Sequence, residues 1–133
     1  MIVVDTTVWI DFFGAKDTTF DRHLTELIEN DAPIVLVDVI YLEVLQGIRD
    51  DDIYQRTRNT LLVHPILRAR GLQTFEAAAN LCRAARRRGL TIRRTVDCLI
   101  AAICLEAGAA LYHNHRDYDA LAKVSSLTIH RLT

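Results

Sequence analysis

Short β-branched apolar runs alternate along the chain with segments whose apolar residues recur at helical spacing. The runs 2–4 and 34–37, Ile-Val-Val and Ile-Val-Leu-Val, are typical of buried strands. Segments 19–30 and 39–48 place apolar residues three and four positions apart, which predicts amphipathic helices. The pattern also predicts a helix capped by Thr6 or Thr7 and ended by Gly14, a helix capped by Thr95 and running to 108, helices over 50–62, 75–88 and 118–123, and short strands over 63–67, 109–112 and 127–129.

Strands that are separated by helices favour one class of fold. Such an order implies a parallel sheet with helices on both faces, because parallel neighbours need a long crossover connection. We therefore expect an α/β fold, a three-layer α/β/α domain with a central, mainly parallel sheet. A length of 133 residues fits one domain, and the sequence contains no repeat, linker or low-complexity segment, so a single domain over 1–133 is predicted.

Charge limits the ways in which this chain can bind a polyanion. Half of its residues are apolar and a quarter are charged, as in a globular protein, and the formal net charge is −1. A net charge this close to zero gives the chain no overall electrostatic attraction to nucleic acid. Binding of nucleic acid would need local charge asymmetry or bound cations.

The cysteines and the chain start indicate the compartment. Cys82, Cys98 and Cys104 are odd in number and lie in apolar helical stretches without Cys-x-x-Cys spacing, so free buried thiols are expected. The first residues show no basic segment typical of a signal peptide. The longest apolar stretch, 98–110, contains Glu106 and is too short to span a membrane. We expect a cytoplasmic protein in a reducing compartment, with no membrane partner.

Four carboxylates are placed where a parallel sheet would bring them together. Asp5 ends the first strand, Glu43 lies one turn into the helix after the second, Asp97 lies in the first turn of the helix at 95, and Asp117 follows the strand over 109–112. Ligands bind α/β sheets at the carboxyl ends of the strands, so all four are candidates for one site.

Clustered carboxylates repel one another unless a cation neutralises them, and hard divalent ions prefer oxygen ligands. A metal held in this way can activate water and stabilise charge on a phosphodiester. Each acid also has a structural alternative: Asp5 as a strand end, Glu43 as part of a solvated face, Asp97 as a partner of the helix dipole, and Asp117 as a helix cap.

The residues around these acids resemble the motifs of the PIN-domain family, and within it the VapC toxins. Val4-Asp5-Thr6-Thr7-Val8-Trp9-Ile10-Asp11 is similar to the opening motif and Glu43-Val44-Leu45-Gln46-Gly47 to the second. Asp97-Cys98-Leu99-Ile100-Ala101-Ala102 resembles the third, and Arg116-Asp117-Tyr118 the closing Arg-Asp-Phe. Each motif is weak alone, but the four occur in the right order over essentially the whole chain.

The resemblance implies a toxin ribonuclease. It implies cleavage of RNA that depends on Mg²⁺ or Mn²⁺, with Asp5, Glu43, Asp97 and Asp117 as catalytic and metal-binding residues. It also implies neutralisation by a cognate VapB-type antitoxin, with a homodimer and a toxin–antitoxin hetero-oligomer as the expected assemblies.

Three further residues near the motifs have open roles. Many relatives carry an Asp two residues before the last motif's Asp, and His115 stands there in this chain. His115 could contact metal, phosphate or only solvent, and Asp119 could supply the fourth carboxylate in place of Asp117. Thr6 could bond to a metal ligand or to a metal-bound water, and it could equally cap a helix.

One cluster of arginines surrounds Gly89 and includes Arg86, Arg87 and Arg93. It could be a solvated helix end, where cations meet the helix dipole favourably. It could also contact RNA phosphates or dock an acidic segment of the antitoxin. We prefer the interpretation that it docks the antitoxin.

Other functions use related chemistry. A DNA or flap nuclease would need the same metal site. The sequence shows no residue that would recognise the 2′-hydroxyl of RNA, so it does not decide between a DNA nuclease and a ribonuclease. A signalling receiver domain also gathers acids around Mg²⁺, but it needs an adjacent acidic pair at the first strand, where Asp5 stands alone. An interaction module with a degenerate acidic pocket is the third alternative, and the intact set of four acids argues against it.

Overall fold

A parallel four-stranded sheet forms the centre of the computed structural model, which describes residues 1–132. The strands β1 (Ile2–Val4), β2 (Ile34–Val37), β3 (Ile66–Leu67) and β4 (Ala110–Tyr112) lie in the order β3-β2-β1-β4. Val3 of the central strand pairs in register with Val35 on one side and with Leu111 on the other. The expected last strand over 127–129 is reduced to one parallel bridge between Leu111 and Ile129.

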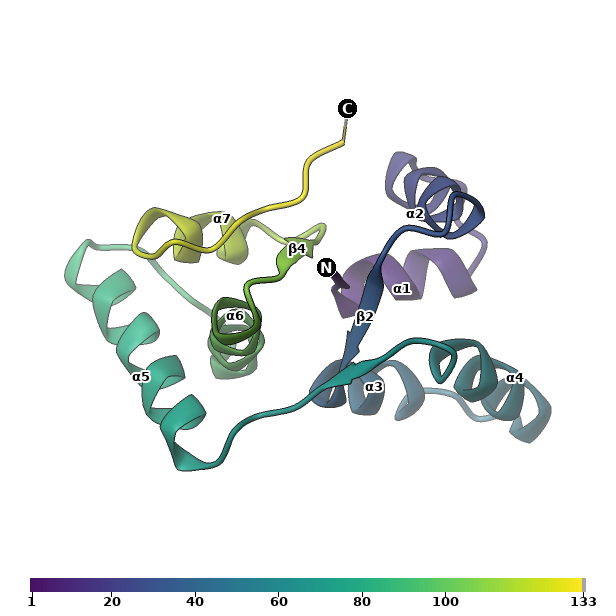
Figure 1. Cartoon of the computed structure of the whole chain (residues 1–133), viewed down its shortest axis with the longest axis horizontal. Helices are drawn as coiled ribbons and strands as arrows, with labels where there is room; N and C mark the ends of the chain where they lie inside the picture. Colours follow the sequence, from purple (N-terminus) through teal and green to yellow (C-terminus); the bar gives the residue numbers. More distant parts are fainter. Residues whose placement is uncertain (133) are drawn as a thin grey trace.

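Helices cover both sides of this sheet and complete the predicted three layers. They are α1 (Thr6–Phe13), α2 (Thr19–Glu29), α3 (Asp38–Leu45), α4 (Asp51–Leu61), α5 (Leu72–Arg87), α6 (Thr95–Ala107) and α7 (Arg116–Lys123). Figure 1 shows α5, α6 and α7 gathered on one side of the strands and α1 to α4 on the other. None of the helices within residues 1–132 is long and apolar enough to cross a membrane.

Several helix starts differ from the expectation. The cap of α1 is Asp5, whose Oδ2 accepts a hydrogen bond from the Thr7 backbone N–H at 3.1 Å, so the expected cap at Thr6 or Thr7 is wrong. Thr95 is the first residue of α6, and the residue before it, Arg94, makes no side-chain capping bond. Helices α5 and α7 begin earlier than predicted, because periodicity locates a buried stripe better than it locates the first turn.

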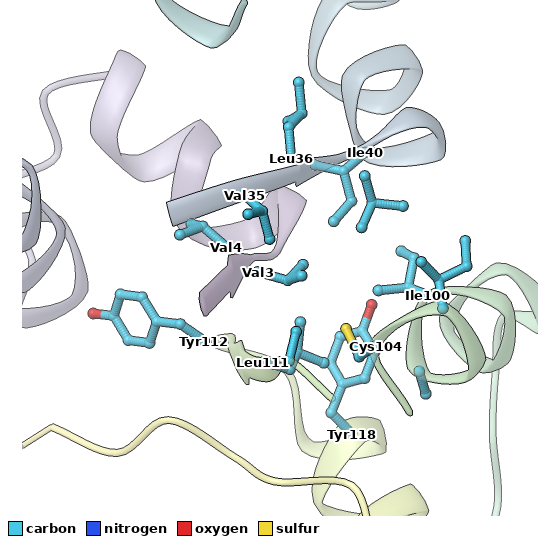
Figure 2. Packing of buried hydrophobic residues seen from close by; sticks show 14 of the residues in the cluster. Val3, Val4, Val35, Leu36, Ile40, Ile100, Cys104, Leu111, Tyr112 and Tyr118 are labelled. Atoms are coloured by element: carbon cyan, nitrogen blue, oxygen red, sulfur yellow. The ribbon is translucent and has the colours of Figure 1, made fainter. Parts of the chain in front are cut away.

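The hydrophobic core fills the space between the sheet and the helices. Val3, Val35 and Leu111 come from three adjacent strands, and Ile100 and Cys104 of α6 pack against the same cluster (Figure 2). Full burial of one such aliphatic side chain contributes about 1.5–3 kcal/mol to the free energy of folding. The core therefore fixes α6, and with it the residues in its first turn, against the carboxyl ends of β1 and β4.

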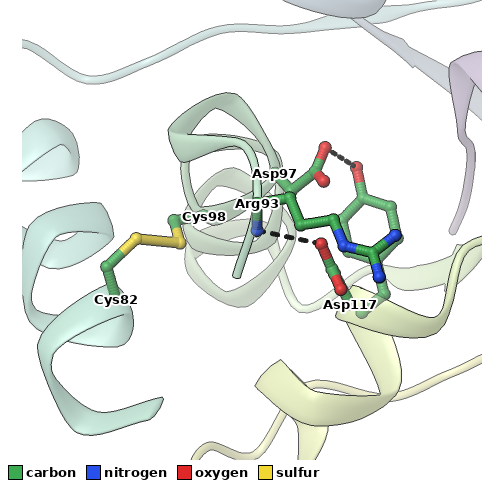
Figure 3. Close-up of a disulfide and its surroundings, with 6 residues drawn as sticks. Cys82, Arg93, Asp97, Cys98 and Asp117 are labelled. Carbon is green, nitrogen blue, oxygen red and sulfur yellow. Dashed lines mark hydrogen bonds between the residues drawn. A yellow bond between two sulfur atoms is a disulfide. The ribbon is translucent and has the colours of Figure 1, made fainter. Parts of the chain in front are cut away.

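A disulfide joins Cys82 of α5 to Cys98 of α6. The expectation of three free thiols is therefore wrong for this pair, while Cys104 is buried and free in the described part of the chain. The sequence hid the pair because the two cysteines lie 16 residues apart on helices that come together only in the fold. Figure 3 shows Cys98 directed toward α5 and its neighbour Asp97 on the opposite side of α6, the side on which Asp117 lies.

Thiol labelling tests the disulfide. Iodoacetamide added to denatured, unreduced protein is expected to alkylate Cys104 alone, and prior reduction should raise the number of labels to three in an intact mass spectrum. Reduction should also lower the free energy of unfolding by about 3 kcal/mol, because it frees a loop of this length in the unfolded chain. Three labels without reductant would restore the expectation of free thiols.

Candidate functional site

Three of the four predicted carboxylates are buried at the carboxyl edge of the sheet. Asp5 follows β1 directly, Asp97 lies in the first turn of α6, and Asp117 lies in the first turn of α7, with 3%, 2% and 3% of their surfaces exposed. Glu43 lies further away along α3 and is only partly buried. Burial of this many acids requires compensation, because an unpaired carboxylate strongly resists removal from water.

One hydroxyl connects two of these carboxylates. Tyr118 is fully buried, and its hydroxyl lies 2.8 Å from Oδ1 of Asp5 and 3.2 Å from Oδ1 of Asp97. The hydroxyl has one proton, so it can donate to only one carboxylate at a time, and the shorter contact is to Asp5. Asp5 gains further support from Thr7, whose hydroxyl donates to Oδ2 at 2.7 Å.

Asp97 is the least compensated acid of the site. Its Oδ2 is buried and has no hydrogen-bond partner within residues 1–132. Desolvation by burial, aided by the nearby charge of Asp5, raises the pKa of Asp97 to about 6, although Arg94 acts in the opposite direction. An unpartnered buried oxygen with a raised pKa makes Asp97 a candidate ligand for a cation.

Asp97, His115 and Asp117 form the group that is close enough to share an ion, because one ligand atom from each lies within 4.8 Å of the others. The Arg93 backbone N–H donates to Oδ2 of Asp117 at 3.1 Å and fixes this carboxylate (Figure 3). Nδ1 of His115 accepts a hydrogen bond from the Asp117 backbone N–H at 3.1 Å and so caps α7.

That cap decides what His115 can do. A neutral imidazole has one free lone pair, and here Nδ1 uses it, so the ring proton lies on Nε2. His115 therefore positions Asp117 and offers an N–H donor, and it could bind a metal only by giving up the cap. The hard oxygen donors of the group are Asp97 and Asp117, a pair that suits Mg²⁺ or Mn²⁺.

Glu43 is held by two partners and stands apart from this group. The Thr6 hydroxyl donates to Oε1 at 2.7 Å, and the Arg94 guanidinium forms an ion pair with Oε2. Partial burial lowers the pKa of Arg94, but the charges of Glu43 and Asp97 outweigh it and the net shift is upward. Thr6 thus orients the Glu43 carboxylate, and Arg94 offsets its charge.

Asp119 does not join the acidic group. Its Oδ1 lies 3.3 Å from the Arg131 guanidinium and 3.5 Å from Nε2 of His113, and its side chain is about half exposed. Of the two carboxylates that could complete the site, the structure brings Asp117 and not Asp119 to Asp97.

The arginine cluster divides into separate positions. Arg93 contacts the site through its backbone, while the exposed Arg86 borders a groove between α5 and α6 that is also lined by Phe75, Val96 and Leu99. Arg87 is exposed at the end of α5. The cluster is therefore not one continuous patch facing the acids.

Sequence reasoning missed Tyr118 and Arg94 as parts of the site. Tyr118 stood in the closing motif beside Asp117, which was the one available signal. Arg94 reaches Glu43 across 51 positions of the chain, and no local pattern indicates such a pair.

Comparisons with known proteins place this arrangement in context. The PIN domain family profile matches residues 2–124. A VapC ribonuclease of Mycobacterium bovis and ribonuclease VapC11 of Mycobacterium tuberculosis are each 34% identical over 128 residues, covering 96% of this chain and 96% of the relative.

Solved structures share the fold at lower identity. The Rickettsia felis VapBC2 complex bound to a promoter DNA fragment gives a TM-score of 0.76 at 17% identity and covers 100% of both chains. VapC20 of Mycobacterium tuberculosis, described as a toxin that cleaves the sarcin–ricin loop, gives 0.70 at 16% identity over 96% of this chain and 98% of that one.

The pH dependence of stability tests the environment of Asp97. Its pKa is raised to about 6 in the folded protein. Below about pH 4 Asp97 is protonated, and its burial does not lower the free energy of unfolding. As the pH rises through 6 the buried carboxyl ionises, and stability is lost. Without metal, the advantage of Asp97→Asn over the wild type should grow by about 2–3 kcal/mol between pH 4 and pH 7 in urea denaturation.

Asp31→Asn removes an exposed carboxylate from the turn after α2 and controls for the loss of one negative charge. A wild type and an Asp97→Asn variant with parallel stability curves from pH 4 to pH 7 would contradict the description of Asp97 as an uncompensated buried acid.

Proposed function

The chain belongs to the PIN domain family, and we propose that it is the toxin of a VapBC-type toxin–antitoxin pair, an endoribonuclease that hydrolyses RNA phosphodiester bonds. The observation that carries this proposal is the buried acidic edge, where Asp97 holds an oxygen without a partner beside Asp117. The ribonuclease names of relatives that are 34% identical over 96% of the chain support it. We propose a single domain over 1–133 that acts in the cytoplasm, where such a substrate would be met.

The proposed cofactor is Mg²⁺, with Mn²⁺ as a substitute. Asp97 and Asp117 would hold the ion, and Asp5 and Glu43 would complete the acidic surroundings as direct ligands or through bound water. When bound, the ion would act as a Lewis acid toward a phosphate oxygen and lower the pKa of a coordinated water. The unpartnered Oδ2 of Asp97 fits this role, because a cation would supply the missing partner.

The other residues of the site hold these carboxylates in place. The Tyr118 hydroxyl fixes the spacing of Asp5 and Asp97, the Arg93 backbone N–H fixes Asp117, and Thr6 fixes Glu43. Carboxylates that are already held in place lose little conformational entropy when a metal ion binds to them. Arg94 leaves a guanidinium at the edge of the acidic group, where it would neutralise part of a phosphate's charge.

The proposed partners are RNA, a second copy of the chain and a VapB-type antitoxin. Arg86 borders the apolar groove between α5 and α6, and Arg87 is exposed beside it, so these two are proposed to dock an acidic antitoxin segment. Arg93 lies next to Asp117 and is proposed to contact an RNA phosphate. Homodimers would assemble with the antitoxin into a hetero-oligomer.

Paired substitutions test the function and the fourth carboxylate together. Asp117→Asn should lower Mn²⁺-dependent cleavage of an RNA oligonucleotide by more than about 100-fold, the upper range for a residue that only supports a ligand. Asp119→Asn, the matched substitution in the same helix, should lower the rate far less, because its carboxylate faces Arg131 and His113 and not Asp97. Cleavage rates of the two variants with and without EDTA measure both effects.

Other outcomes lead to other conclusions. Greater loss for Asp119→Asn would move the site to that residue. Cleavage of DNA but not of RNA of the same sequence would favour a DNA or flap nuclease, and no metal-dependent cleavage of either polymer would favour a non-catalytic interaction module.

A further inference from the structure

A cavity opens beside the acidic group of Asp97, His115 and Asp117. Its volume is about 500 Å³, and its lining comes from the turn between β4 and α7, the start of α2 and the C-terminal segment. His115, which caps α7 at Asp117, is also part of its lining. The cavity therefore adjoins the acidic group through His115, and its size suits one small organic group such as a nucleotide.

His113 gives this cavity an unused hydrogen-bond donor. Its side chain is only 5% exposed, and it lines the cavity. Nδ1 accepts a hydrogen bond from the His115 backbone N–H at 2.9 Å, so the proton of the neutral ring lies on Nε2. This buried Nε2 makes no hydrogen bond within residues 1–132, and its contact with Oδ1 of Asp119 is long, at 3.5 Å. A buried donor without an acceptor is costly, and a ligand acceptor would remove that cost.

The remaining lining favours an anion. Arg116 and Arg131 contribute two cationic side chains, against the single carboxylate of Asp119. Asp119 offsets part of the charge of Arg131, at 3.3 Å, and Arg116 forms no ion pair within residues 1–132, so the lining keeps an excess of positive charge. The capped His115 adds a further N–H donor on Nε2. Donors thus outnumber acceptors, which excludes a metal cation as the preferred occupant.

Aromatic rings supply part of the apolar lining, beside Ile129 and Leu132. Phe20 from the start of α2 and His130 from the C-terminal segment both border the cavity. Nucleobases stack on such rings in proteins that bind single-stranded RNA. An anionic group beside Arg116 and a flat base beside these rings are the two parts of one nucleotide.

We propose that this cavity is a subsite for one nucleotide of the RNA strand next to the cleaved bond. The Nε2–H of His113 donates to that nucleotide, Arg116 and Arg131 contact its phosphate, and Phe20 and His130 contact its base. The subsite rests on the proposed ribonuclease function, because it gives the scissile bond its position relative to Asp97 and Asp117.

Binding without cleavage tests the subsite. In EDTA, the affinity for a fluorescein-labelled RNA oligonucleotide is measured by anisotropy for wild type, for His113→Asn and for Arg116→Ala/Arg131→Ala. His113→Asn keeps an acceptor for the His115 N–H and removes the Nε2 donor, so about tenfold weaker binding is expected. The double variant should also flatten the log–log salt dependence by about one unit for each arginine that no longer meets a phosphate. Arg49→Ala/Arg56→Ala removes two exposed arginines outside the cavity and is expected to bind like the wild type.

A small-molecule arm separates this proposal from the proposed function. Nitrogen NMR of the histidine rings should show the Nε2 signal of His113 shifting with a nucleoside 5′-monophosphate, and about tenfold more inorganic phosphate should be needed for the same shift. Equal response to phosphate, or unchanged RNA affinity in both cavity variants of a wild type that cleaves RNA, would overturn the subsite while leaving the function intact. Nucleotide binding that His113→Asn abolishes, in a protein that cleaves no RNA, would retain the subsite and refute the ribonuclease.

Discussion

Asp5 and Asp97 are buried side by side at the end of the sheet, and both contact a hydroxyl that has only one proton to give. Tyr118 satisfies Asp5 at 2.8 Å, and Asp97 is left with a longer contact and one oxygen without any partner in residues 1–132. The fold tolerates this arrangement only because the core holds α6 and α7 against β1 and β4. A bound cation would relieve the repulsion between these acids, so under our proposal the fold gives up some stability in exchange for function.

The carboxylates also tie the layers of the fold together. Asp5 caps α1 and accepts from Thr7, and the Thr7 hydroxyl in turn accepts from the Asn114 backbone N–H at 3.1 Å in the turn before α7. Asp97 meets α7 through Tyr118, and the next residue, Cys98, is bonded to α5. These contacts connect the two acids to α1, α5 and α7. A substitution at either acid should therefore change both the geometry of the site and the stability of the protein.

Periodicity in the sequence predicted the parallel sheet and the helix order, because apolar residues form short continuous runs in buried strands and recur every three or four positions in amphipathic helices. It failed at Asp5, which caps α1, and at the Cys82–Cys98 pair, because both depend on where the chain turns in space. The site followed the same division. Asp5, Asp97 and Asp117 could be predicted from strand ends and helix starts, whereas the roles of Tyr118 and Arg94 depend on side chains that meet only across the folded chain.

The central claim is that a divalent cation completes this acidic edge. The most direct measurement is the free energy of unfolding at pH 7 as a function of Mn²⁺ concentration, for wild type and for Asp97→Asn. An ion that binds only the folded state should stabilise the wild type by about 1.4 kcal/mol for each tenfold increase above its dissociation constant, with little gain in the variant. Stability that does not respond to Mn²⁺ in the wild type, or that responds equally in both proteins, would contradict the account.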